Sequence, residues 1–376
     1  MIRLAHVIDT FGADFLTQYQ HKLKPEHTRA LSAMKQCRTQ ASPKMHVQCT
    51  GCEHQTLVPH SCGHRHCPHC QHHESQQWLE RQMKRLVPTA YFMITFTLPA
   101  EFRALAAAHQ GVVYDLLMRC SWETVRTFSQ NDRQLQGMPG AIAVLHTNTR
   151  RLDYHPHVHL VMPGAAVNAK LKQWRTKRCA KGKGKGKGKG EGGYLFNHKA
   201  LAKVFRAKLL AALDAAGLTL PLRYPQKWVV DCKSVGSGEP ALIYLGRYLY
   251  RGVIRENDVL ACEDGQVRFR YQNAKSGKME YRTVPGAQFL WLVLQHVLPK
   301  GFRRARNFGF LHPNCKRMIA LLQVLLKYVP SQAATWMKAR APILCAHCGA
   351  AMVIVKTQIR TSLAAIMAAP TATGVL

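Results

Sequence analysis

Two histidines separated by one apolar residue, His157 and His159, lie in a segment, residues 155–162, whose composition favours a β-strand. Side chains two positions apart on a strand point to the same face, so both imidazoles could reach one divalent cation. Imidazole is a borderline ligand for hard ions, which leaves Mn²⁺ as well as Mg²⁺ open. A third ligand has to come from elsewhere, and His146 and His155 are the candidates.

Two tyrosines four residues apart, Tyr244 and Tyr248, would share one face of a helix. A phenol oxygen can attack phosphorus and hold the 5′ end of a strand. Phenol has a pKa near ~10, so phenolate can leave again when a 3′-hydroxyl attacks. A bound cation would stabilise the charge on the phosphate oxygens. Each pattern alone is more typical of packing, but together they predict cleavage and rejoining of a phosphodiester.

The cysteines predict structural zinc. Two CxxC pairs are separated by fourteen residues and could complete one tetrahedral site, Cys49, Cys52, Cys67 and Cys70. Five neighbours could substitute for these ligands or build a second site, namely Cys37, Cys62, His64, His66 and His69. A third CxxC pair, Cys345 and Cys348, has no evident partner except His312 and Cys315.

The charge of the chain favours a polyanionic partner. Lys and Arg number 53 against 20 Asp and Glu, a net charge of +33 over 376 residues. Nucleic acid fits this excess better than an anionic membrane, because no apolar run approaches the ~20 residues that span a bilayer. The N-terminus lacks the apolar core of a signal peptide, so a cytoplasmic location and no membrane partner are expected.

The elements that would position these residues suggest an α+β fold with an antiparallel sheet. Strands are expected at 91–98, 140–146, 155–162 and 228–230, with a hairpin at 267–271 and 279–284. Helices are expected at 74–86, 101–128 and 198–213. The Lys-Gly repeat at 181–190 predicts a flexible loop, and residues 361–376 predict a disordered tail.

Several motifs together resemble the two-tyrosine rolling-circle transposases of bacterial insertion sequences, within the HUH single-strand endonuclease superfamily. The motifs are SCGHRHCPHCQ at 61–71, FTLP at 96–99, AVLHT at 143–147, YHPHVH at 154–159, YLGRY at 244–248 and HVLPKGF at 296–302. The resemblance implies metal-binding roles for His157 and His159, nucleophilic roles for Tyr244 and Tyr248, and zinc-binding roles for the four CxxC cysteines. It also implies a palm-like antiparallel sheet of HUH type behind a small zinc-binding domain.

The resulting hypothesis is a transposase that nicks and rejoins single-stranded transposon ends and target DNA, using structural Zn²⁺ and catalytic Mg²⁺ or Mn²⁺. It would act in the bacterial cytoplasm, associated with the nucleoid. The expected organisation is a zinc-binding domain at 1–88, a nuclease domain at 89–260 and a basic C-terminal region at 261–376. The alternatives are a non-catalytic zinc-dependent DNA-binding protein, including a decayed transposase, and a plasmid replication initiator of the same chemistry.

Overall fold

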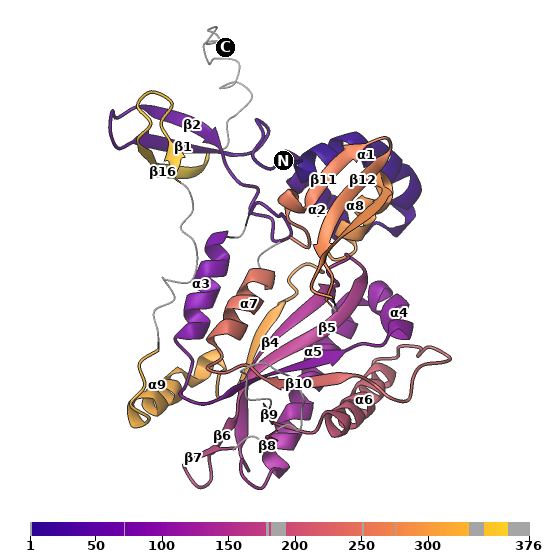
Figure 1. The fold of residues 1–376 in the computed structure, drawn as a ribbon, viewed down its shortest axis with the longest axis vertical. Helices are drawn as coiled ribbons and strands as arrows, with labels where there is room; N and C mark the ends of the chain where they lie inside the picture. The colour runs from indigo at the N-terminus through magenta and orange to yellow at the C-terminus, as the bar shows by residue number, and fades with distance from the viewer. Residues whose placement is uncertain are drawn as a thin grey trace.

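The computed structural model describes residues 2–70, 72–177, 180–181, 193–249, 252–274, 276–330 and 342–359. At the centre of this part of the chain lies a seven-stranded sheet in which all paired strands are antiparallel (Figure 1). Its order is β10-β3-β5-β4-β6-β7, and β14 also pairs with β4. The strands are β3 (Tyr91–Thr97), β4 (Met138–Asn148), β5 (Tyr154–Pro163), β6 (Ala165–Asn168), β7 (Gln173–Thr176), β10 (Val230–Ser234) and β14 (Ala305–Gly309).

Helices cover both faces of the central sheet. Successive residues of a strand point to opposite sides of the sheet, so β4 contributes apolar side chains to a core on each face. Ala141, Ala143 and Leu145 of β4 belong to the core on the side of α4 (Arg103–Ala108), α5 (Gln110–Asn131) and α6 (His198–Ala215). Ile142 and Val144 belong to the core on the other side, with α3 (His72–Met83), α7 (Glu239–Leu249) and α9 (Lys316–Leu325). The α+β class with an antiparallel sheet is thereby confirmed.

A second group of elements joins the N-terminus to a distant part of the chain. Helix α1 (Leu4–Tyr19) packs against α8 (Gly286–Leu294), and Phe15 and Phe289 are fully buried in their shared core. The core also includes α2 (Pro25–Gln36) and the three-stranded sheet of β11 (Val259–Glu263), β12 (Gln266–Gln272) and β13 (Met279–Pro285). The hairpin expected at 267–271 and 279–284 is confirmed as β12 and β13.

A small separate sheet combines two segments that are far apart in the sequence, 44–59 and 343–359, in the order β15-β16-β1-β2. Its strands are β1 (Lys44–Cys49), β2 (Gln55–Pro59), β15 (Ile343–Leu344) and β16 (Ala351–Ile359). The sequence did not predict these strands, nor that β14 joins the central sheet. The domain boundaries expected at 88 and 260 stay a prediction. In the structure, two strands of the range 261–376 pair with strands of the other two ranges: β14 pairs with β4, and β16 pairs with β1.

The remaining elements are short. They are η1 (Gln20–Lys22), η2 (Ala100–Phe102), η3 (Glu256–Asp258), η4 (Pro313–Cys315), β8 (Ala180–Lys181) and β9 (Gly193–Tyr194). The predicted Lys-Gly loop lies outside the described residues beyond Lys181, and so does the predicted tail at 361–376. Across the described ranges, no helix has the length and apolarity needed to cross a membrane.

Candidate functional site

Three histidines converge on the face of the central sheet that α3 and α7 cover. His157 and His159 lie on β5, and His146 lies on β4 directly opposite His157. One ring nitrogen of each histidine lies within 4.8 Å of the others. Their ring centroids are between 4.5 and 5.2 Å apart. The structure therefore brings together the predicted histidine pair and His146, one of the two candidates for a third ligand.

His155, the other candidate, is not part of this group. Arg103 donates a hydrogen bond to its Nδ1 at 3.1 Å, which occupies one of its two ring nitrogens. Its main-chain oxygen still contributes to the site, because Nδ1 of His157 donates to it at 2.7 Å.

Hydrogen bonds fix the orientation of the two strand histidines. Nδ1 of His157 is a donor, and Nδ1 of His159 pairs with Oγ1 of Thr95 on β3 at 2.9 Å. When Nδ1 is engaged in this way, Nε2 is the nitrogen that a metal ion can use. Thr95 was not singled out in the sequence, although the antiparallel pairing of β3 with β5 places it beside His159.

Burial keeps the three imidazoles neutral. Loss of solvent lowers the pKa of His157 to about 4 and that of His159 to about 3. It also places the pKa of His146 well below its usual value, and the neighbouring histidines add to this effect. Neutral imidazole is the form that binds a metal ion, so the group is ready for one at neutral pH. Three nitrogen donors suit a transition-metal ion better than Mg²⁺.

Tyr244 faces this histidine group from α7. The centroid of its ring lies 6.4 Å from that of His146 and 6.3 Å from that of His159. Leu242 and Leu245 on the same helix are fully buried against the sheet, which fixes the position of α7. The predicted nucleophile and the predicted metal ligands therefore lie in one site.

The start of α7 depends on one glycine. Gly238 has a φ of +87°, and a Cβ built on it would lie 2.7 Å from the ring of Tyr91 on β3. Only glycine accepts both this backbone conformation and this close approach. Tyr248 follows Tyr244 by four residues in α7, as the sequence pattern predicted, and its nucleophilic role stays a prediction.

A cationic cleft opens beside Tyr244. It has a volume of about 320 Å³. Five guanidinium groups and one carboxylate, that of Asp258, are among its lining groups. Asp258 is paired with two of these guanidinium groups at 2.7 and 3.0 Å. The arginines are Arg150, Arg247, Arg255, Arg270 and Arg304. Such a surface attracts an anion such as the phosphate backbone of a nucleic acid.

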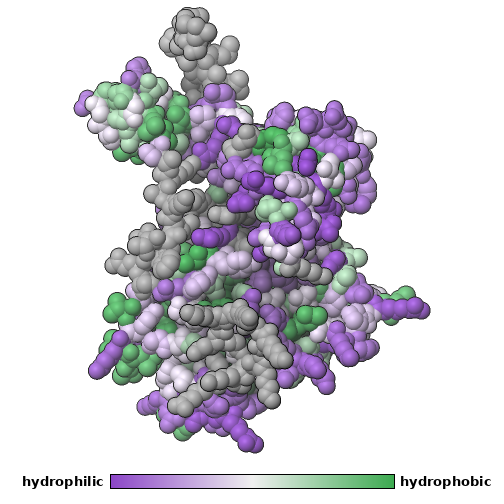
Figure 2. Space-filling model, viewed as in Figure 1, coloured by the Kyte–Doolittle hydropathy of each residue, from purple (hydrophilic) through white to green (hydrophobic). Residues whose placement is uncertain are grey.

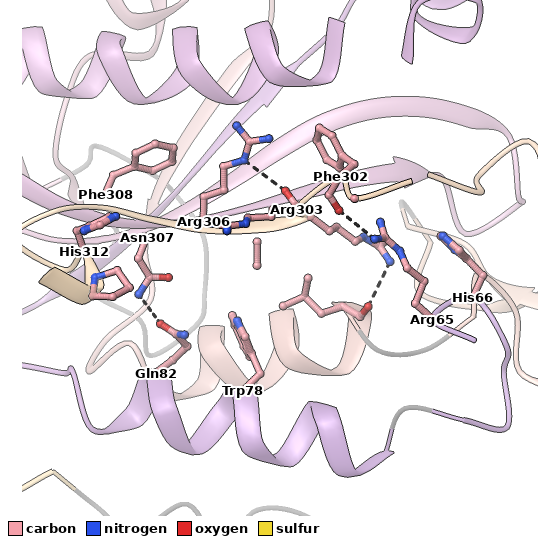
Figure 3. Close-up of a pocket in the computed structure, with 15 residues that line it drawn as sticks. Arg65, His66, Trp78, Gln82, Phe302, Arg303, Arg306, Asn307, Phe308 and His312 are labelled. Atoms are coloured by element: carbon pink, nitrogen blue, oxygen red, sulfur yellow. Dashed lines mark hydrogen bonds between the residues drawn. The ribbon is translucent and has the colours of Figure 1, made fainter. Parts of the chain in front are cut away.

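A second, larger cleft of about 800 Å³ lies between α3 and residues 301–313 (Figure 3). Trp78 and Gln82 of α3 face it from one side and Asn307 from the other, where the Asn307 side-chain amide donates to Oε1 of Gln82 at 2.7 Å. Arg304 contributes to the lining of both clefts. One cationic side chain therefore lines both cavities, and its charge contributes to the lowered pKa values of His146 and His157.

Arg304 is held by main-chain oxygens. Its Nε donates to the oxygen of Leu145 on β4 at 2.9 Å, and its Nη1 to that of Leu249 at the end of α7 at 3.4 Å. No carboxylate of the described residues forms an ion pair with it. Burial lowers its pKa to about 10, so it remains cationic at neutral pH. Arg304 was not predicted from the sequence, where the arginine-rich segment after Phe302 was the available signal.

The cysteines form two clusters, which corrects the expected single zinc site. Cys67 and Cys70 lie with Cys37 and Cys62, whereas Cys49 and Cys52 lie with Cys345 and Cys348. The reason is the hairpin of β1 and β2. Cys49 and Cys52 lie at its turn, and the five residues of β2 separate them from the later cysteines. Five residues of strand span ~17 Å, far more than one tetrahedral site allows.

The first cluster fits a structural zinc ion. The Sγ atom of Cys37 lies 3.6 Å from those of Cys67 and Cys70, and the Sγ atom of Cys62 lies 3.6 Å from that of Cys70. Zn–S bonds of ~2.3 Å in a tetrahedron give S–S distances of ~3.8 Å. Cys62, expected as an additional ligand, is thus placed in the cluster.

Two of the neighbouring histidines have structural contacts instead. His69 forms an ion pair with Glu256 at 2.6 Å, and this carboxylate also accepts a hydrogen bond from the main-chain N–H of Leu4 at the start of α1. His66, also expected as an additional ligand, is outside the cluster. Its Nε2 accepts a hydrogen bond from the main-chain N–H of Leu298 at 3.2 Å.

Comparison with known proteins gives two family matches. Residues 140–318 match the family described as "Putative transposase", and residues 7–98 match the family described as "Transposase zinc-binding domain". The second match agrees with structural zinc bound by cysteine clusters. The first match contains the three histidines, Tyr244 and Arg304.

Individual relatives and solved structures were also found. The chain is 33% identical to "Putative transposase y4qJ" of Sinorhizobium fredii, over 80% of this chain and 79% of that protein. It is 27% identical to the transposase for insertion sequence element IS801 of Pseudomonas savastanoi pv. phaseolicola, over 77% of this chain and 71% of that protein. A solved structure of the conjugative relaxase TrwC in complex with OriT DNA aligns with 15% identity and a TM-score of 0.24, over 64% of this chain and 73% of that one. This structural likeness is too low to carry an argument. The family matches and the two relatives show that the chain belongs to the insertion-sequence transposase family that includes the IS801 transposase.

Proposed function

We propose that this transposase cuts and rejoins single-stranded DNA at the ends of its element through a covalent bond between a 5′ phosphate and Tyr244. The observation that carries the proposal is the position of the Tyr244 ring, 6.3 and 6.4 Å from two of three converging neutral histidines. Tyr244 packs against the core beside the sheet, and its ring lies next to a cluster of three groups of metal-ligand type.

The reaction is an exchange of phosphodiester bonds. The phenol oxygen of Tyr244 forms a bond to phosphorus, the bond from phosphorus to the 3′ oxygen breaks, and the proton of the phenol ends on that 3′ oxygen. In the reverse sense, a 3′-hydroxyl of the same or another strand attacks the phosphotyrosine and restores the phenol. Because one phosphodiester replaces another, no nucleotide cofactor is required.

The protein groups around Tyr244 have separate tasks. His146, His157 and His159 would hold one divalent cation, Mn²⁺ or Mg²⁺, which supplies Lewis-acid polarisation of the phosphate when bound. The arginine-rich cleft would hold the flanking phosphates and align the strand with Tyr244. Tyr248 is proposed as the second nucleophile, which would allow two 5′ ends to be held at once.

The proposed substrates are single-stranded transposon ends and the target strand, and the proposed place of action is the bacterial cytoplasm at the nucleoid. A non-catalytic zinc-dependent DNA-binding protein, including a decayed transposase, is the remaining alternative. Such a protein would bind DNA without forming a bond to it.

Labelled single-stranded oligonucleotides that cover the flanks of the gene test the proposal. With Mn²⁺ present, the wild-type chain should form an adduct that survives denaturing electrophoresis, and Tyr244→Phe should abolish it. Tyr281→Phe is a matched control, since Tyr281 is exposed on β13 and outside the site. Binding of every oligonucleotide without an adduct would support the non-catalytic alternative.

A further inference from the structure

Four cysteines from two distant segments of the chain meet at the edge of the small sheet. Cys49 and Cys52 lie at the turn after β1, and Cys345 and Cys348 at the turn after β15. Their sulfur atoms all lie within 4.8 Å of one another. Two contacts cross between the pairs, with Sγ–Sγ distances of 3.4 Å from Cys49 to Cys348 and 3.7 Å from Cys52 to Cys345.

These distances fit a tetrahedral metal site and not a pair of disulfides. Four thiolates with Zn–S bonds of ~2.3 Å lie ~3.8 Å apart, whereas the sulfurs of a disulfide lie ~2.05 Å apart. The main-chain N–H of Gly51 donates to Sγ of Cys49 at 3.3 Å, which stabilises the thiolate form. In the first cluster, His64 N–H donates to Sγ of Cys62 at 3.4 Å in the same relative position.

We propose that Cys49, Cys52, Cys345 and Cys348 bind a second structural zinc ion, which joins the segments 44–59 and 343–359 into one zinc-binding unit. Cys345 and Cys348 lie outside both segments that match known families, 7–98 and 140–318. The zinc-binding part of this transposase is therefore built from two segments that are 293 residues apart at Cys52 and Cys345.

The packing of the small sheet explains why it needs the ion. Its core consists of a few side chains around the cysteines, chiefly Met45, Val47 and Met352. Val353, Ile354 and Val355 on β16 are each more than half exposed, and Figure 2 shows apolar residues on the surface of this sheet. So small a core buries too little apolar surface to hold two hairpins together, and a tetrathiolate zinc site supplies the missing stability.

The metal also determines the pairing of strands. β1 pairs with β16 in antiparallel fashion, with Gln48 opposite Val353 and Cys49 opposite Met352. Because the cysteines lie at the end of this ladder, the ion fixes its register where the two turns meet. His54 and His347, one from each turn, have ring centroids 4.1 Å apart, which shows how closely the turns approach.

Cobalt titration of the full-length chain tests the proposal. Co²⁺ bound by thiolates gives an intense charge-transfer absorbance in the near ultraviolet that imidazole ligands do not give. The titration uses the variant His157→Ala/His159→Ala, so that these imidazoles do not take up cobalt. The absorbance should saturate at two equivalents per chain, one for each cysteine cluster. Saturation at one equivalent would overturn the proposal.

Further substitutions in that background assign the second equivalent. Cys345→Ser/Cys348→Ser should saturate at one equivalent and retain the absorbance of the first cluster. Cys262→Ser/Cys315→Ser is the matched control, because both residues are partly exposed and belong to neither cluster, and it should still saturate at two. If Cys345→Ser/Cys348→Ser also saturated at two, these residues would not be ligands. The count of two equivalents is made before any cysteine is replaced, so it does not depend on whether the cysteine variants fold.

Discussion

At the scale of single residues, sequence spacing predicts which side chains share a face within one strand. It does not predict which strands bring their side chains together. His157 and His159 were predictable because a two-residue spacing on a strand forces both rings onto one face. His146 could only be a candidate, because its role depends on the register of β4 against β5. That register cannot be read from the sequence. The cysteines show the same limit. The CxxC spacing predicted knuckles, but which knuckles meet depends on the hairpin between them.

Arg304 gives a prediction at this scale. Its guanidinium lies between the two clefts, is held by two carbonyl oxygens, and has no carboxylate partner among the described residues. A DNA phosphate would complete its environment. Removing one preorganised donor of this kind costs ~100-fold or more in rate. We therefore expect Arg304→Gln to lower the rate of adduct formation by about that factor, measured in single-turnover assays.

Arg304→Lys is the informative control, because lysine keeps the charge but not the planar pair of donors. Its rate should lie between those of the wild type and Arg304→Gln. The thermal midpoint of each variant must be measured as well, since the hydrogen bonds to Leu145 and Leu249 also join β4 to α7. An unchanged adduct rate in Arg304→Gln would assign the residue to packing alone.

At the scale of elements, the long periodic segments were predictable and the short ones were not. The helices at 74–86 and 198–213 and the strands at 91–98, 140–146 and 155–162 appear as α3, α6, β3, β4 and β5 within a few residues. β14 and β15 have five and two residues, too few for a periodic signal. They are strands because of the partners that the tertiary fold gives them, β4 and β16.

The contact of α7 with α3 leads to a prediction about Gly246. A Cβ at this position would lie 3.3 Å from the ring of Trp78 on α3, and Ser75 donates a hydrogen bond to the main-chain oxygen of Gly246 at 3.0 Å. A large side chain there would force the two helices apart and move Tyr244 away from the histidines. We expect Gly246→Leu to lower the thermal midpoint and the rate of adduct formation together.

Gly12→Leu is the matched control for this substitution. Gly12 is also inside a helix, α1, but nothing lies within 4 Å of a Cβ built there. Leucine has a better helix propensity than glycine by roughly 0.5–1 kcal/mol, so this variant should be at least as stable as the wild type. If Gly246→Leu behaved like Gly12→Leu, the close packing of α7 on α3 would not be what positions Tyr244.

At the scale of the whole molecule, net charge was the most useful property of the sequence. An excess of 33 positive charges predicted a polyanionic partner without any knowledge of the fold. It could not predict where those charges gather. The cleft beside Tyr244 collects its five arginines from several separate segments between Arg150 and Arg304, and only the folded chain brings them to one place.

The cleft makes the salt dependence of binding predictable. Five arginines and one aspartate give it four net positive charges, by 5 − 1 = 4. A single strand that neutralises about four charges should bind with a slope of log K against log salt near −3, which is a loss of about 50-fold between 50 and 200 mM salt. Fluorescence anisotropy with a labelled single-stranded oligonucleotide measures this slope.

A charge-matched pair of variants locates the contacts. Arg150→Gln/Arg247→Gln removes two cleft arginines, so the magnitude of the slope should fall by about 1.4 if each contact contributes ~0.7. Arg126→Gln/Arg133→Gln removes the same charge from exposed positions near the end of α5 and just after it. Ser129 of α5 donates to the main-chain oxygen of Gly137, so this end of α5 lies at the start of β4, the far end of that strand from His146. β4 has eleven residues, and at ~3.3 Å per residue the two ends lie ~30 Å apart, well beyond the Debye length of ~10 Å at 0.1 M salt. Distant charges therefore add little at the cleft, and equal slopes in the two double variants would place the DNA on another surface.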